Sequence, residues 1–130
     1  MDIELFTVCD FAEDMGNGKM VIVGTFDVIW ATSMPAVHPA CAIAARIRVY
    51  QKESGKHTLT ISIKDTHGSR IVSPVEGEFV ATIPEEHESG IVNLTIGIGQ
   101  LQLTNLGKHT VDLEIDGTTV RSLPFFVRQK

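Results

Sequence analysis

The stretch GKHTVDLEIDG (residues 107–117) carries the two signals that decide the fold. Apolar and polar residues alternate along it, which is the pattern of a β-strand with one buried face. The apolar residues of that face are Val111, Leu113 and Ile115. Asp116-Gly117 then predicts a tight hairpin, because both residues tolerate the positive φ that a two-residue turn requires. The stretch therefore indicates a strand that turns directly into an antiparallel partner.

The same alternation recurs along the whole chain, and no window shows the period of an amphipathic helix. Asn17-Gly18 is a second hairpin signal, and loop 31–40 contains two prolines, which are excluded from central strands. The expected strands cover residues 3–12, 20–30, 41–50, 57–65, 91–103, 109–116 and 119–129, with a strand pair across Pro74 between residues 70 and 83. About eight or nine short strands at this spacing indicate an all-β antiparallel sandwich of two sheets.

Length and charge limit the class of protein. The 130 residues are close to the usual size of one domain, so we expect residues 1–130 to form a single domain. The net charge of −5 offers no positive field to nucleic acid or to an anionic membrane, and we expect neither as a partner. No apolar run approaches the ~20 residues of a membrane helix, and from the first residues, MDIELFTVCDFAED, we expect no secretory signal. We therefore expect a cytoplasmic protein in which Cys9 and Cys41 are buried, unreactive thiols.

Several segments together resemble a group of small bacterial proteins of about this length. These segments are CDFAED (9–14), GNGKMVIVGTFD (16–27), MPAVHP (34–39), ARIRV (45–49), a GKH strand start with a later Asp-x-x-Gly turn, and LGKHTVDLEIDG (106–117). The group shares an immunoglobulin-like sandwich of unknown function, and its members often carry tyrosine where this chain has His109. The resemblance implies an immunoglobulin-like antiparallel β-sandwich and a bacterial origin. It carries over no catalytic residue.

Five histidines raise the question of a metal site. His57 and His67 flank one expected strand and would lie on the order of 30 Å apart at ~3.3 Å per residue. His57 and His109 would meet only if their strands began side by side, and spacing fixes no third ligand. The glycine motifs for nucleotides are incomplete, and no serine or cysteine has the surroundings of a nucleophile. We predict no metal, no cofactor and no enzyme activity.

The tetrapeptide GKHT occurs twice, at residues 55–58 and 107–110, and alternation places both histidines on the inward face of a strand. His109 corresponds in position to the corner tyrosine of immunoglobulin-like domains, which hydrogen-bonds back to nearby backbone. An imidazole can make the same bond. We therefore predict that His57 and His109 are structural pegs at the starts of two strands.

One segment, loop 30–39, contains more large apolar and conformationally restricted residues than a simple connection between strands needs. Its distinctive residues are Trp30, Met34, Pro35, His38 and Pro39. Tryptophan and methionine are enriched in the cores of protein interfaces, and prolines reduce the entropy that a loop loses on binding. Two interpretations stay open: the loop contacts a partner, or Trp30 and Val37 fold back and cap the end of the sandwich.

These observations favour a non-enzymatic protein-interaction module that binds a protein partner, or a second copy of itself, through loop 30–39 or a sheet edge. Arg121, Arg128 and Lys130 flank the last strand and mark it as an edge protected against indiscriminate pairing. Two alternatives remain. One is a small-ligand binder or enzyme that uses His38, His57 or His109, and the other is a structural subunit of a larger bacterial assembly.

Overall fold

Nine β-strands form nearly all of the regular structure, and the computed structural model describes every residue from 1 to 130. The strands are β1 (Asp2–Gly16), β2 (Lys19–Thr25), β3 (Val28–Ala31), β4 (Ala36–Tyr50), β5 (Gly55–Lys64), β6 (Val75–Ala81), β7 (Ser89–Leu103), β8 (Gly107–Ile115) and β9 (Thr118–Gln129). A short 3₁₀ turn, η1 (Gln51–Glu53), joins β4 to β5. The structure contains no helix with the length and apolarity needed to cross a membrane. The all-β prediction and the expected number of strands are confirmed.

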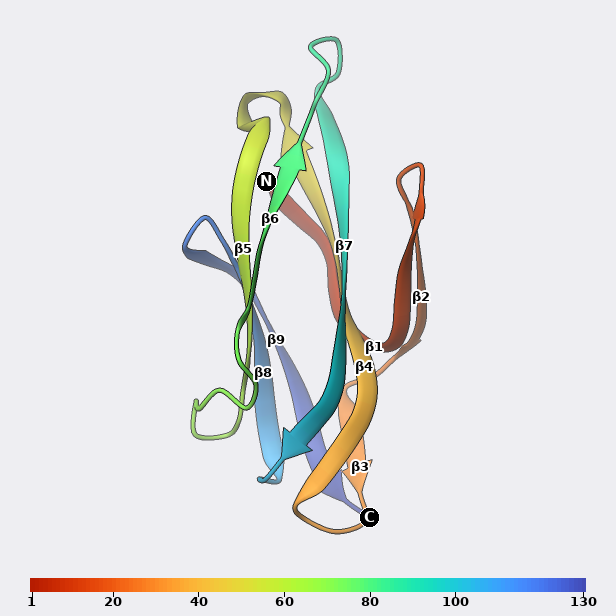
Figure 1. The fold of residues 1–130 in the computed structure, drawn as a ribbon, viewed down its shortest axis with the longest axis vertical. Coiled ribbons are helices and arrows are strands. Elements are labelled where there is room, and N and C mark those ends of the chain that lie inside the picture. Colours follow the sequence, from red (N-terminus) through yellow and green to blue (C-terminus); the bar gives the residue numbers. More distant parts are fainter.

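The strands form two sheets that face each other (Figure 1). Their orders are β2-β1-β4-β7 and β3-β9-β8-β5-β6. A core of 22 buried residues draws on both sheets, because each strand turns its alternate apolar side chains inward. On β4 these are Cys41, Ile43, Ala45, Ile47 and Val49, and on β8 they are Val111, Leu113 and Ile115. The two-sheet sandwich is confirmed.

Both predicted hairpin turns are present. Asn17 and Gly18 have φ angles of 54° and 76° between β1 and β2, and Asp116 and Gly117 have φ angles of 52° and 82° between β8 and β9. Positive φ at both central residues matches the right-handed twist of the flanking strands, which is why Asn-Gly and Asp-Gly are favoured here. These two dipeptides therefore fix where the antiparallel pairs begin.

Two of the strand predictions, for residues 20–30 and for region 70–83, were wrong. Residues 20–30 do not form one strand, because the chain leaves the first sheet after β2 and enters the second as β3. The change follows Gly24, whose φ is 69° and whose backbone lies so close to the side chain of Asp10 that a Cβ would collide with it. In addition, β3 pairs with β9 in parallel, so the sandwich is not purely antiparallel. Region 70–83 contains one strand, β6, and a single bridge between Lys64 and Arg70 in place of the expected pair.

Pro39 lies inside β4, a central strand, although the sequence placed it in a loop. The pairing explains how β4 accommodates it. On one side β1 pairs with β4 only as far as Cys9 opposite Ala42, so no β1 neighbour reaches Pro39. On the other side, His38 pairs with Leu101 of β7 and Ala40 pairs with Gly99, while Pro39 between them has no paired residue. The missing N–H of proline therefore breaks no ladder hydrogen bond with β1.

The hairpin formed by β1 and β2 stands beside the sandwich in Figure 1 and creates a second, smaller apolar cluster. Its buried members are Cys9, Ala42 and Ala44, with Met20 and Ile22 packed against them. Cys9 and Cys41 are both buried, as predicted, and burial raises the pKa of each thiol above its ordinary value. Both sulfurs are therefore held in the unreactive neutral form.

Candidate functional site

The two GKHT histidines lie at opposite ends of neighbouring strands. β5 and β8 are antiparallel, with Leu59 opposite Ile115 and Lys64 opposite Thr110. Since His57 begins β5 and His109 begins β8, this register separates them by the length of the paired segment. The two histidines therefore do not form a shared site.

His57 is held by hydrogen bonds at both ring nitrogens. Its Nδ1 lies 2.7 Å from Oδ2 of Asp116, and its Nε2 lies 2.7 Å from the carbonyl oxygen of Glu53. The ring stacks on Phe79, with centroids 5.4 Å apart. The pKa of His57 lies above its ordinary value, first because of the bond to Asp116 and then because of the Glu53 carbonyl. Only the protonated imidazole can donate to both acceptors, so the site favours a fixed cation.

His109 is completely buried at the start of β8. Its Nδ1 lies 3.1 Å from the carbonyl oxygen of Gly107, two residues upstream, and its ring packs against Phe125 at 5.1 Å between centroids. The other nitrogen, Nε2, is buried without a partner. This is the backbone bond that the peg hypothesis requires, and the burial leaves no route by which a substrate could reach the ring.

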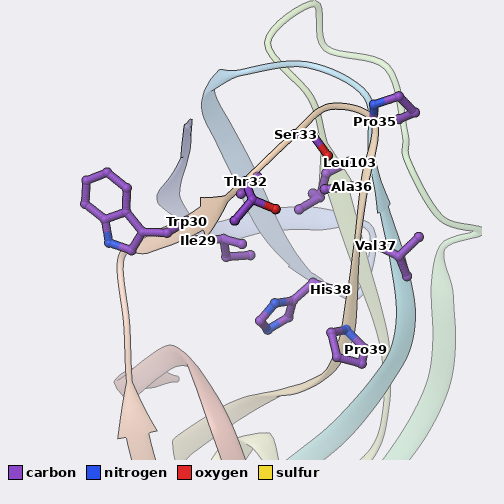
Figure 2. A pocket seen from close by; sticks show the side chains of 11 residues that line it. Ile29, Trp30, Thr32, Ser33, Pro35, Ala36, Val37, His38, Pro39 and Leu103 are labelled. Atoms are coloured by element: carbon purple, nitrogen blue, oxygen red, sulfur yellow. The ribbon is translucent and has the colours of Figure 1, made fainter. Parts of the chain in front are cut away.

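The segment expected to be loop 30–39 consists of the end of β3, a connection of residues 32–35, and the start of β4. This segment, still called loop 30–39 below, surrounds a hollow with a volume of about 360 Å³ at one end of the sandwich (Figure 2). The side chains of Ile29, Thr32 and His38 point toward its middle, whereas the indole of Trp30 points away. Trp30 is 54% exposed and Val37 is 47% exposed. The capping interpretation is therefore wrong for these two residues, although Met34 does pack against the main core.

The chemistry available in the hollow is limited. His38 is the single titratable side chain in its lining, and no carboxylate, lysine, arginine or cysteine joins it. Its Nε2 is buried without a hydrogen-bond partner, and its ring lies against Phe26 with centroids 5.8 Å apart. General acid–base catalysis needs a proton donor or acceptor within hydrogen-bond reach of a substrate and usually a second group that orients it. His38 has no such second group. Elsewhere, no three His, Cys, Asp or Glu side chains are placed to hold a metal ion.

The last strand, β9, is a sheet edge over only part of its length. β9 is an inner strand at its C-terminal end, where residues 126–129 pair with β3. Its cationic residues have other contacts: Arg121 donates to the carbonyl oxygen of Ile3 at 2.7 Å, and Arg128 lies over the ring of Phe126. The short β3 covers the C-terminal part of this edge because the chain changes sheets after Gly24, which the alternation pattern did not reveal.

The longest free edge belongs to β7. β4 pairs with one side of it from Ser89 to Leu103, and no strand pairs with the other side. About half of the N–H and C=O groups of such a strand point away from its neighbour and remain open to another strand. β7 and β6 lie at the front of Figure 1, so the viewer faces this side of the sandwich.

The inward side chains of β7 are also incompletely covered. Val92, Leu94 and Ile96 contact the core but stay partly exposed. The residues of β4 that pair with them are Ile47, Ala45 and Ile43, and each of these is at most 1% exposed. The difference arises because β4 has a neighbour on both sides at these positions and β7 has one on a single side. An added strand would therefore cover apolar surface as well as backbone.

A comparison with protein families matches residues 4–128 to a family of unknown function, DUF6941. The chain belongs to the DUF6941 family. The match runs from β1 to β9 and includes His38, His57, His109 and the whole of β7. The resemblance to a family of unknown function is thereby confirmed. No curated protein matches the chain.

Among solved structures, this DUF6941 protein is similar to two crystal structures of a β-glucosidase from Listeria innocua, in complex with glucose and with isofagomine. The TM-scores are 0.51 and 0.49, and the sequence identity is 10% in both comparisons. The alignments cover 95% of this chain but 16% of the glucosidase chain. The chain thus spans about one sixth of that enzyme's length, and the first likeness shows a shared fold alone.

Proposed function

We propose that this DUF6941 protein is a non-enzymatic protein-interaction module that accepts an extended strand of a partner at the free edge of β7. The observation that carries the proposal is the edge itself: 15 residues long, paired on one side, and flanked by partly exposed apolar side chains. Strand addition supplies main-chain hydrogen bonds for affinity, and side-chain contacts for specificity. Loop 30–39 is a second candidate surface, supported by the exposed indole of Trp30.

The alternative of a small-ligand site or enzyme that uses a histidine has weaker support. His57 has both ring nitrogens occupied, His109 is fully buried, and His38 has no titratable neighbour in its hollow. We further propose an immunoglobulin-like sandwich of bacterial origin and cytoplasmic location. The bond from His109 to the backbone upstream, at the start of β8, supports the immunoglobulin-like assignment. The remaining alternative, a structural subunit of a larger bacterial assembly, is compatible with the proposal, because strand addition at β7 would join the subunit to its neighbour.

Site-specific photo-crosslinking tests the interaction proposal. A photoreactive amino acid replaces Gln102, an exposed residue on β7, or the exposed Val120 on β9 as a matched control, and the protein is irradiated in a lysate of its host. We expect crosslinks to a partner from position 102 and not from position 120. Adding Gly97→Lys, which places a charge on β7, should remove these crosslinks. Equal crosslinking from both positions, or crosslinks unchanged by Gly97→Lys, would contradict strand addition at β7.

A further inference from the structure

We propose that the strand added to β7 is β7 of a second copy of this chain, in antiparallel pairing about a two-fold axis. The inference rests on the proposed function, because it requires that the β7 edge accepts a strand. The two four-stranded sheets would then continue into one another across the pair of β7 strands. Loop 30–39 would stay free in each copy for a different contact.

The composition of β7 supports this assignment. Its sequence, SGIVNLTIGIGQLQL, contains no charged residue and no proline over 15 residues. The other outer strands carry features that discourage pairing: β2 has Lys19, β6 has Glu76 and Glu78, and β3 is four residues long. Proteins protect free edges with charges, prolines or short strands, and β7 uses none of these. β7 is therefore the outer strand on which another strand can pair at least cost.

Self-pairing suits a strand of this kind. In an antiparallel pair related by a two-fold axis, residues at equal distances on either side of the axis face each other, so a charge near the axis lies close to its own copy. On β6, an axis at Gly77 would place Glu76 opposite Glu78 of the second copy, whereas β7 has no charge to repel in any register. The pairing is also closed, because each β7 has a single free side and the pair uses both. A closed pair explains how the chain keeps a long uncharged edge without open-ended association.

Pairing would also complete the burial of the core. Val92, Leu94 and Ile96 face the core of their own copy yet remain partly exposed at the sandwich edge. A second β7 beside them would cover this side, as β1 covers the equivalent side of β4. The interface would therefore combine backbone hydrogen bonds with apolar burial, which is the composition that strand addition needs.

The test is the mass of the purified protein as a function of concentration, measured by sedimentation equilibrium. We expect the wild type to approach 28.4 kDa, twice the 14.2 kDa of one chain. Gly97→Lys should raise the dissociation constant of the dimer roughly tenfold or more, because two lysines enter the edge. Gly97→Ala is the matched control: a Cβ at Gly97 meets nothing within 4 Å, so the dimer should persist. Trp30→Ala should likewise leave the dimer unchanged.

A wild type that stays at 14.2 kDa at all concentrations, or a dimer that Gly97→Lys leaves intact, would overturn self-pairing. The crosslinking experiment then separates the two proposals. A monomeric protein that still crosslinks from position 102 to a different protein retains strand addition at β7 and loses the second copy as its partner. A monomer without such crosslinks contradicts both.

Discussion

The Nδ1 atom of His57 lies 2.7 Å from Oδ2 of Asp116, although 59 residues separate the two in sequence. The antiparallel pairing of β5 and β8 brings the start of one strand beside the end of the other. Asp116 also accepts a hydrogen bond from the backbone N–H of Thr58 at 3.0 Å through its other oxygen, Oδ1. One carboxylate therefore fixes a hairpin turn, a neighbouring strand and a histidine.

This contact predicts a pH dependence of stability. The pKa of His57 is raised in the folded state, so its contribution is fully present below about pH 6.5, the ordinary histidine pKa, and is lost as the pH rises through the folded value. The pKa of Asp116 is lowered, chiefly by His57, so its contribution is present above about pH 3.9 and is lost as the pH falls through the folded value. Both contributions are present together between about pH 4 and about pH 6.5.

The measurement is the melting temperature of the wild type and of Asp116→Asn from about pH 4 to about pH 9. Asparagine tolerates the positive φ of the turn and removes the charge, so it isolates the ion pair. We expect the difference in melting temperature between the two proteins to be largest near pH 5 to 6, roughly, and to shrink above neutral pH. A difference that grows with rising pH would show that His57 is not the group responsible.

The histidine at the other strand start gives a second prediction. His109→Ala removes a fully buried ring that packs on Phe125, and it should lower the free energy of unfolding by roughly 2–4 kcal/mol. His109→Tyr keeps a ring and a hydrogen-bonding group at the position, so it should cost less. Urea denaturation of the three proteins measures the order. A tyrosine variant less stable than the alanine variant would defeat the peg hypothesis.

Most of the strands and their inward faces were predictable because alternation is a local property of the chain. His57 and His109 were placed correctly on the inward face by parity alone. The contact between His57 and Asp116 was not predictable, because it depends on which strands become neighbours. The same holds for β3: nothing local in residues 20–30 shows that the second half joins the other sheet, in parallel with the C-terminal strand.

The sequence suggested a sheet edge at the last strand as a candidate interaction surface, but the longest free edge lies on β7. The charges around the last strand suggested an edge there, whereas the short β3 covers part of it and β7 carries the long free edge. The absence of charge from residues 89–103 was a usable signal. It could be interpreted only once the sheet order was known, because an uncharged strand is also what a central strand requires.

Fluorescence of Trp30, the only tryptophan, tests the orientation of the loop. Its indole points away from the hollow and is largely exposed, so the emission maximum should be close to that of tryptophan in water. Acrylamide should quench it almost as strongly in the folded as in the unfolded protein. Trp30→Ala should accordingly leave the melting temperature unchanged. Blue-shifted, poorly quenched emission would instead mean that the indole caps the sandwich.

Two glycines give a matched pair of backbone predictions. Gly117 has a φ of 82°, and a Cβ there would meet nothing within 4 Å, so Gly117→Ala carries only the cost of the left-handed backbone. We expect a loss of roughly 1–2 kcal/mol in the free energy of unfolding. Gly97→Ala faces the same open space without a positive φ, and its effect should stay within about 0.5 kcal/mol. Equal losses in thermal or urea denaturation would contradict the assigned turn geometry.

The central claim is that the free edge of β7 receives β7 of a second copy, and hydrogen exchange of its backbone amides measures this most directly. Exchange of the wild type and of Gly97→Lys is followed by mass spectrometry at low and at high protein concentration. We predict that peptides covering residues 89–103 of the wild type become protected at high concentration, while those of Gly97→Lys and those covering loop 30–39 do not. Exchange in residues 89–103 that is independent of concentration would contradict self-pairing at β7. New protection in loop 30–39 would place the contact at the loop.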